Sequence, residues 1–240
     1  MTVVLFDLDD TLIVYNGVAE ASWRLVCEQL APGFGVETDV LLAELLTQRA
    51  WFWSLEARSR EGRRCPRWAR GVVAARAMEA LGLEGRDVDL LVDGYERARE
   101  ASAHAVPGAV EALRALRKEG AALGLVTNGE ARAQRTKLSR FELADYFDYI
   151  FIEGERGSAK PSQSCFLEPT NALGAKPGEA WMVGDDPVRD IAGANAAGLR
   201  TIWVNPTGRP FPDGLETGRV VTSVREVPPL IKRYREARGG

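Results

Sequence analysis

The chain has 240 residues, of which 45% are hydrophobic, so it can bury a substantial core, either as one large domain or as a core with an insertion. A net charge of −3 and a pI of about 5.5 give no electrostatic basis for binding nucleic acid. No apolar run reaches the length of a membrane span, and the chain starts directly with a strand-like segment, so we expect neither a membrane span nor a signal peptide.

The cysteine and histidine content excludes two further classes of site. Cys27, Cys65 and Cys165 are far apart and form no Cys-x-x-Cys pair, and His104 is the one histidine. Neither a structural zinc site nor a Ser-His-Asp triad is therefore expected. An odd and dispersed set of cysteines suits a reducing compartment, which predicts a cytoplasmic protein.

The first predicted element is a strand over Val3–Phe6, because four apolar residues in a row are typical of a strand buried on both faces of a parallel sheet. Ligands of such sheets bind beyond the carboxyl ends of the strands, where Asp7 and Asp9 lie. Two carboxylates this close favour a proton or a cation between them. The alternative is an acidic turn or helix cap. An EF-hand loop is excluded because Leu12 and Val18 occupy the positions of its glycine and glutamate.

Residues 15–105 show helical periodicity and no strand pattern. The first helix has an apolar face from Trp23 to Leu30, and we expect it to end at Pro32. Further helices are expected over residues 38–53, about 66–81 and about 88–101.

From residue 106 onward, helices and strands alternate. Helices are expected over 109–118, 131–140, 162–173, 188–197 and 224–237, and strands over 122–126, 149–152, 180–183, 201–204 and 220–221. This alternation predicts an α/β fold, a Rossmann-like doubly wound parallel sheet. Because the first strand must join the sheet, residues 1–14 and 106–240 are predicted to form the core, with residues 15–105 inserted as an all-helical domain.

Three further groups of polar residues lie at element ends. Thr127-Asn128-Gly129 follows a strand, where a hydroxyl and backbone N–H groups suit a phosphate oxygen. Lys160 precedes a helix and could neutralise phosphate charge, whereas Lys176 lies before a strand, remote from its carboxyl end. Gly184-Asp185-Asp186-Pro187-Val188-Arg189-Asp190 follows the next strand and opens a helix. Each group taken singly could be an ordinary turn, a solvated lysine or a helix cap.

In this order, and with Asp7-Leu8-Asp9-Asp10-Thr11 at their head, these groups resemble the four motifs of the haloacid dehalogenase (HAD) superfamily of phosphohydrolases. The helical block lies where the C1 cap domain of subfamily I is inserted. One departure is local: Ala159 and Ser162 flank Lys160-Pro161, where many relatives have glycine and an acidic residue.

The resemblance implies a role for each matching residue. Asp7 would be the nucleophile, Asp9 the general acid and base, and Lys160 the cation that neutralises the phosphoryl group. The residues implied to bind the substrate are Thr11, Thr127, Asn128 and Gly129.

The resemblance also implies Mg²⁺ as cofactor, which suits an all-oxygen site. Its ligands would be the carboxylates of Asp7 and Asp185 and the backbone carbonyl of Asp9, with Asp186 and Asp190 as supporting residues.

The implied activity is that of a Mg²⁺-dependent phosphatase acting on a small soluble phosphomonoester. The dehalogenases of the superfamily lack the second aspartate, and its phosphonatases need a lysine in the cap, whereas no lysine precedes Lys118. A sugar phosphomutase is the alternative enzyme. A phosphate- or metal-sensing protein without turnover is the alternative from another class, although such a protein would be expected to lose Asp9 or Lys160.

The substrate and the oligomeric state are not determined by the sequence. Trp51, Phe52 and Trp53 are expected mainly to fill the core of the helical domain rather than to line a pocket. The arginines between Arg58 and Arg70 are expected to form a solvated helix end rather than an anion site.

Overall fold

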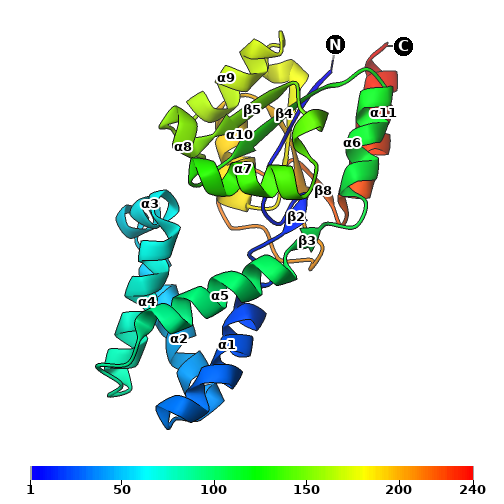
Figure 1. Ribbon diagram of the computed structural model, residues 1–240. Helices are drawn as coiled ribbons and strands as arrows, with labels where there is room; N and C mark the ends of the chain where they lie inside the picture. Colours follow the sequence, from blue (N-terminus) through cyan, green and yellow to red (C-terminus); the bar gives the residue numbers. More distant parts are fainter. Residues whose placement is uncertain (1, 240) are drawn as a thin grey trace. The chain divides into compact units, whose positions relative to one another are not determined.

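The computed structural model describes residues 2–239, which form two compact units (Figure 1). Within the described residues, the core unit comprises residues 2–14 and 104–239, and the helical unit comprises residues 15–103. The second boundary lies two residues before the expected one, because β3 (His104–Ala105) pairs antiparallel with β2 (Ile13–Val14) and so stays with the core unit.

The core unit is built on a six-stranded sheet with the order β5-β4-β1-β6-β7-β8, in which every neighbouring pair is parallel. Its strands are β1 (Val3–Phe6), β4 (Ala122–Thr127), β5 (Tyr149–Ile152), β6 (Ala180–Gly184), β7 (Arg200–Val204) and β8 (Arg219–Val221). The sheet confirms the predicted doubly wound α/β fold. β1 lies at its centre, and all four of its residues are fully buried, which explains its unbroken apolar run.

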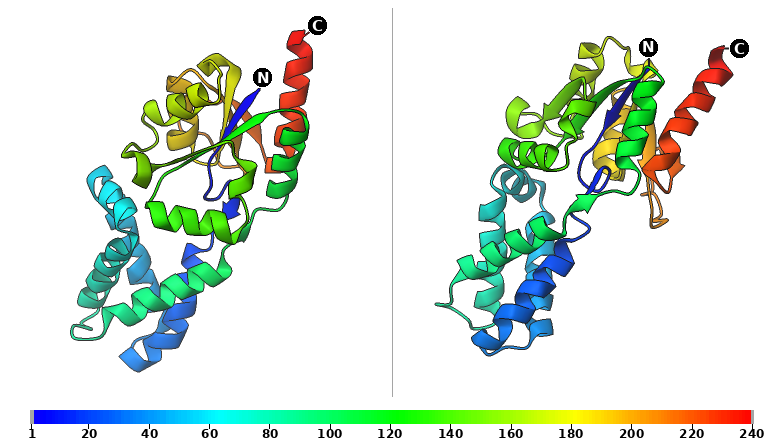
Figure 2. Two further views of the ribbon diagram at one scale, coloured as in Figure 1. Left: turned by 45° about the horizontal axis from the view of Figure 1, so that its top comes forward. Right: turned by 45° about the vertical axis from the view of Figure 1, so that its right-hand side comes forward.

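Helices cover both faces of this sheet (Figures 1 and 2). The helices of the core unit are α6 (Ala109–Lys118), α7 (Ala131–Arg140), α8 (Glu153–Arg156), α9 (Ser164–Ala172), α10 (Gly193–Ala196) and α11 (Val227–Gly239). Val3 and Leu5 pack in one cluster with Phe166 of α9 and Ala194 of α10. Since side chains alternate along a strand, the other residues of β1 face the side on which α6 and α11 lie together.

Two expected helices of the core unit differ in detail. The expected helix over 188–197 is a π-helical turn, Pro187–Ala192, followed by α10, and the last helix begins with a 3₁₀ turn, Val224–Glu226. The expected helix over 162–173 is α9, which runs continuously from Ser164 to Ala172 with Pro169 inside it. None of the helices in the described part of the chain is both long and apolar enough to cross a membrane.

The helical unit contains five helices within the described residues: α1 (Ala19–Phe34), α2 (Thr38–Trp53), α3 (Glu56–Arg64), α4 (Pro66–Ala80) and α5 (Val88–Ser102). The predicted end of α1 at Pro32 is wrong, because Pro32 lies inside the last turn and Gly35, at φ 77°, ends the helix. The sequence prediction also missed α3, whose strongly basic composition carries no apolar periodicity.

The aromatic residues at the end of α2 divide between core and surface. Phe52 is fully buried, as expected, whereas Trp51 and Trp53 are 37% and 41% exposed. Successive residues of an α-helix point about 100° apart, so three in a row cannot all face the core.

Part of the basic run between Arg58 and Arg70 is engaged within the helical unit. The guanidinium of Arg58 lies 4.0 Å from the centre of a Trp51 ring, and Arg63 pairs with Glu56.

Candidate active site

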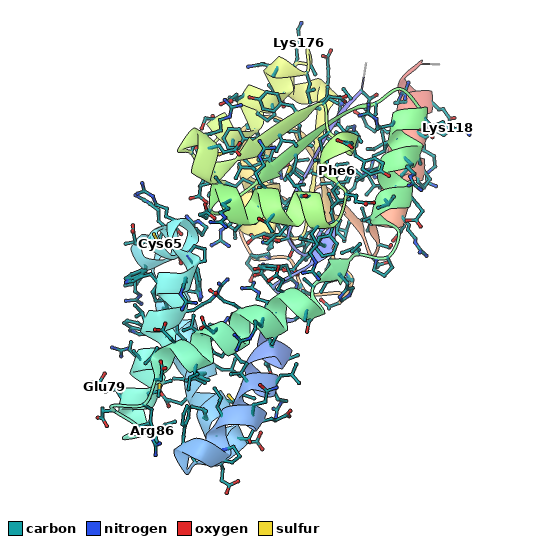
Figure 3. All side chains as sticks on the ribbon, in the orientation of Figure 1. Phe6, Cys65, Glu79, Arg86, Lys118 and Lys176 are labelled. Carbon is teal, nitrogen blue, oxygen red and sulfur yellow. The ribbon has the colours of Figure 1, made fainter. Side chains whose placement is uncertain are left out.

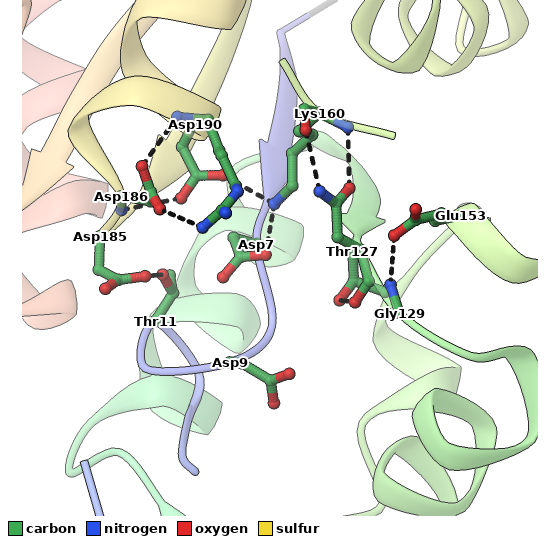
Figure 4. Close-up of polar contacts among 12 residues, drawn as sticks. Asp7, Asp9, Thr11, Thr127, Gly129, Glu153, Lys160, Asp185, Asp186 and Asp190 are labelled. Atoms are coloured by element: carbon green, nitrogen blue, oxygen red, sulfur yellow. Dashed lines mark hydrogen bonds and ion pairs between the residues drawn. The ribbon is translucent and has the colours of Figure 1, made fainter. Parts of the chain in front are cut away.

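Asp7 lies directly after β1, at the centre of the carboxyl edge of the sheet (Figure 4). Its backbone N–H donates to the carbonyl of Val183, which continues the β1–β6 ladder by one residue. Its carboxylate accepts a hydrogen bond from Lys160 Nζ, and the same ammonium donates to Asp190 Oδ1 at 2.7 Å. All three side chains are buried, so a cation and two carboxylates share one enclosed group.

Burial governs the electrostatics of this group. Burial raises the pKa of Asp7 to about 8; Lys160 opposes the shift and Asp190 adds to it. Burial also raises the pKa of Asp190. For Lys160, burial by itself lowers the pKa, but Asp190 and Asp7 outweigh it and raise the pKa above its usual range. Lys160 is therefore a fixed positive charge, held where a developing negative charge could be neutralised.

The side-chain amide of Asn128 fixes the position of Lys160. Asn128 Nδ2 donates to the Lys160 carbonyl at 3.0 Å, and the Lys160 backbone N–H donates to Asn128 Oδ1 at 2.8 Å. Two hydrogen bonds between an amide and a peptide group restrain both the position and the orientation of the loop. Asn128 was expected to bind the substrate through this group, but in this structure the amide holds the lysine loop.

The segment after β6 supplies two further carboxylates, Asp185 and Asp186, besides Asp190. Asp186 caps the following turn by accepting from the backbone N–H groups of Val188 and Arg189, at 2.9 and 2.8 Å. Asp190 turns back and accepts from the Asp186 N–H at 3.0 Å. This approach requires a glycine at 184, because a Cβ there would clash with Asp190 Oδ2.

The side-chain carboxylate of Asp185 forms no ion pair among the described contacts, although Arg209 Nη2 donates to its backbone carbonyl at 3.1 Å. Thr11 Oγ1 donates to its Oδ1 at 3.5 Å, which is a weak hydrogen bond. Burial, together with the nearby carboxylates of Asp190 and Asp7, raises the pKa of Asp185 to about 9. Its backbone carbonyl is well held, since Trp203 Nε1 donates to it at 2.8 Å.

The donor set fits a divalent cation. Among the described residues, Asp7, Asp185 and Asp190 form the cluster of potential metal ligands, with carboxylate oxygens within 4.8 Å of one another. Three ionised carboxylates and the Lys160 ammonium sum to a formal charge of −2. An all-oxygen set with this excess charge suits Mg²⁺ better than a soft metal.

The carboxylate of Asp9 lies apart from this cluster and is turned away from Asp7 (Figure 4). Lys137 Nζ contacts Asp9 Oδ1 at 2.8 Å and Oδ2 at 2.7 Å. Gln134 Nε2 lies 3.3 Å from Asp9 Oδ2 and donates to Thr127 Oγ1 at 2.5 Å. The sequence prediction missed both residues. The feature that could have identified them is their spacing: they lie three residues apart, and so on one face, of the helix that follows Thr127-Asn128-Gly129.

The backbone N–H of Gly129 is also engaged, although it was expected to be free for a phosphate. It donates to Glu153 Oε2 at 2.9 Å, and Glu153 is buried at the start of α8. No local pattern distinguishes Glu153 from the other acidic residues of the chain. Lys176, by contrast, is exposed on the outside of the core unit, in agreement with its exclusion from the site (Figure 3).

Comparisons with known proteins identify the family of the chain. Residues 1–198 match the family of haloacid dehalogenase-like hydrolases. The chain is 34% identical to a phosphoserine phosphatase of Thermus thermophilus, over 95% of this chain and 98% of that one. It is 31% identical to a glyceraldehyde 3-phosphate phosphatase of Pyrococcus furiosus, over 84% and 79% of the two chains.

A solved structure has the same fold. The HAD-hydrolase YfnB of Bacillus subtilis, determined with bound magnesium, superposes with a TM-score of 0.74 over 96% of this chain and 98% of that one, at 23% identity. The family match and the parallel sheet confirm the family and the fold class that the sequence predicts. The chain belongs to the haloacid dehalogenase-like hydrolase family.

Proposed function

We propose that the protein is a Mg²⁺-dependent phosphatase that hydrolyses a small phosphomonoester through an aspartyl-phosphate on Asp7. The buried Asp7–Lys160–Asp190 group carries the proposal. It combines a potential nucleophile with a fixed cation at the edge of the sheet where ligands bind. The relatives named as phosphatases support this reaction class.

In the first half-reaction, an Asp7 oxygen attacks phosphorus and the bond from phosphorus to the leaving oxygen breaks. Asp9 donates a proton to that oxygen, so the product leaves as an alcohol. Lys160 neutralises charge on the phosphoryl oxygens, and Asn128 keeps the lysine loop in place for this purpose. Phosphoryl transfer depends mainly on such positioning and charge neutralisation.

In the second half-reaction, water attacks the phosphorus of the aspartyl-phosphate and gives a proton to Asp9. The bond between phosphorus and the Asp7 oxygen breaks, which releases inorganic phosphate and restores the carboxylate. Thr11, Thr127, Asn128 and Gly129 form the proposed surroundings of the phosphoryl group. Because Asn128 and Gly129 already use their side-chain amide and backbone N–H, respectively, their contribution would be mainly to shape the loop.

Mg²⁺ would be held by the carboxylates of Asp7 and Asp185 and the backbone carbonyl of Asp9. When bound, it would neutralise the excess negative charge of the site and of the phosphoryl group. Asp186 and Asp190 would support it from the segment after β6.

We also propose a role for each unit: the core unit is catalytic, and the helical unit is the cap that selects the substrate. The protein would act on a phosphorylated metabolite in the cytoplasm. Its free cysteines fit that compartment.

The test uses p-nitrophenyl phosphate with Mg²⁺ and the variant Asp7→Asn. An amide cannot attack phosphorus, so we expect kcat to fall more than about a thousandfold, or ~4 kcal/mol of barrier. Rapid quench with a ³²P-labelled phosphomonoester should trap a labelled protein in the wild type and not in Asp7→Asn. Retention of more than about a thousandth of the activity would remove Asp7 as the nucleophile.

A panel of phosphorylated metabolites then separates the alternatives. A phosphatase releases inorganic phosphate from its substrate in proportion to turnover. A sugar phosphomutase would convert one sugar phosphate into its isomer with little free phosphate, and a sensor would bind without any turnover.

A further inference from the structure

One face of α7 contacts two of the proposed catalytic motifs at once. Gln134 and Lys137 are three residues apart and therefore lie on the same side of the helix. Gln134 contacts Asp9, Thr127 and the Asn128 carbonyl, and Lys137 contacts both oxygens of Asp9. This face of α7 thus ties Asp9, 128 residues away from Lys137, to the loop after β4.

The start of the helix is itself fixed. The Glu130 side chain accepts from the backbone N–H groups of Arg132 and Ala133, at 2.8 and 2.7 Å, and so caps α7 one turn before Gln134. Because the first turn of α7 is capped, the backbone position from which the Lys137 side chain extends is fixed. The side chains of Lys137 and Asp9 are 11% and 19% exposed, so their contact is largely shielded from water and from salt.

The two contacts of Lys137 restrain the Asp9 carboxylate more tightly than a single hydrogen bond could. An ammonium placed 2.7 and 2.8 Å from the two oxygens resists rotation of the carboxylate about its last bond. Gln134, at 3.3 Å from Oδ2, adds a second donor on one side. The orientation of Asp9 therefore depends on α7 rather than on its own loop alone.

We propose that Lys137 is a positioning residue that acts through Asp9. It holds the Asp9 carboxylate in the position from which Asp9 exchanges protons with the leaving oxygen and with water. Gln134 contacts both Asp9 and Thr127 and so keeps the distance between these two residues constant. The inference rests on the proposed function, because it assigns Asp9 the acid–base role. Lys137 itself forms no bond to the reacting atoms.

The leaving group provides the decisive measurement. An alkyl phosphate leaves as a strongly basic alkoxide unless it is protonated, whereas p-nitrophenolate leaves without a proton. A misplaced Asp9 therefore slows the first half-reaction of an alkyl phosphate and hardly affects that of p-nitrophenyl phosphate. The ratio kcat/KM reports this half-reaction for each substrate.

The experiment compares Lys137→Met with the wild type and with Lys118→Met, a control for an exposed lysine on α6 (Figure 3). We expect Lys137→Met to lower kcat/KM for an alkyl phosphate by about 10–100-fold, since displacement of a catalytic group by ~1 Å costs up to ~10²-fold. For p-nitrophenyl phosphate we expect a change of less than about threefold, since that leaving group needs no proton. Lys137→Arg, which keeps a cation, should restore part of the alkyl activity, and Lys118→Met should match the wild type.

A second comparison uses the Asp9→Asn background with p-nitrophenyl phosphate, which remains reactive without a proton donor. If Lys137 acts through Asp9, adding Lys137→Met to Asp9→Asn should leave kcat/KM unchanged. Equal losses for both substrates, or a further loss in the Asp9→Asn background, would overturn the inference and indicate a direct contact with the substrate or a loss of fold. Failure of the proposed function would differ, because the wild type would then release no phosphate from either substrate.

Discussion

Each unit of the molecule contains a cation surrounded by carboxylates, and the two groups differ chiefly in burial. In the core unit, Lys160 lies between Asp7 and Asp190, with its side chain 2% exposed. In the helical unit, Arg67 lies among three carboxylates with its side chain 52% exposed. The carboxylates around Arg67 are Asp89, Asp93 and Glu96.

The same chemical types therefore give different properties. Water and salt screen the exposed group, so its ion pairs contribute little to the free energy of unfolding. In the buried group each charge depends on its neighbours, and the pKa of Asp7 rises to about 8 mainly because of burial. The comparison indicates that burial, rather than the number of ion pairs, produces the electrostatics suited to catalysis.

The largest expected effect comes from removing the buried cation. Lys160→Met would leave Asp7 and Asp190 buried without a counter-charge, which we expect to lower the free energy of unfolding by about 3–5 kcal/mol. Arg67→Met is the matched control in the helical unit and should leave the urea midpoint unchanged. Urea unfolding at pH 9 with EDTA, where the Asp7 carboxyl of the wild type is ionised, measures both. Similar losses in the two variants would contradict the role given to burial.

The next effect extends the comparison to Asp185, whose carboxylate forms no ion pair among the described contacts. Mg²⁺ should stabilise the wild type by ~2.7 kcal/mol at a hundredfold excess over its Kd. In Asp185→Asn that response should largely disappear. Above about pH 9, where the Asp185 carboxyl of the wild type is ionised, the metal-free variant should also melt at a higher temperature than the metal-free wild type, because one repelling charge is gone. Thermal melts with EDTA and with millimolar Mg²⁺ test this. A variant that responds to Mg²⁺ as strongly as the wild type would refute the proposed metal site.

For a single titrating group and one pH unit, the smallest effect is a dependence of stability on pH in the metal-free protein. The pKa of Asp185 is raised from 3.8 to about 9, and that of Asp7 from 3.8 to about 8. Between about pH 4 and pH 8–9, the folded protein therefore binds more protons than the unfolded chain. The stability that these two carboxyl groups contribute is fully present below about pH 4 and is lost as pH rises toward 8–9. The slope should be at most about 1.4 kcal/mol per pH unit for each group.

Urea midpoints across this range, with EDTA, give the measurement. Asp185→Asn should show a shallower fall than the wild type, because one of the two groups no longer titrates. Mg²⁺ should flatten the wild-type curve as well, since it favours the ionised carboxylates. A wild-type stability that rises with pH between 5 and 8 in EDTA would contradict this account of the buried carboxylates.

Local sequence was sufficient for the parts of this protein that depend on a repeating pattern. The apolar run Val3–Phe6 and its successors predict buried parallel strands, because a strand covered on both faces must be apolar throughout. The polar groups then follow at strand ends, and their order indicates the family. The helices of the inserted unit follow from periodicity in the same way, except α3, whose residues 56–64 have no apolar face.

The partners of the polar side chains were decided only by the tertiary structure. Lys160 and Asp7 are 153 positions apart, and Lys137 and Asp9 are 128 apart. Nothing in the local pattern distinguishes Lys137 from a solvated lysine, or the Asn128 amide from a phosphate ligand. A periodic pattern specifies which face of an element is buried. The partner of a polar group depends on which loops converge at the sheet edge, because a hydrogen bond requires contact in space and leaves no repeat in the sequence.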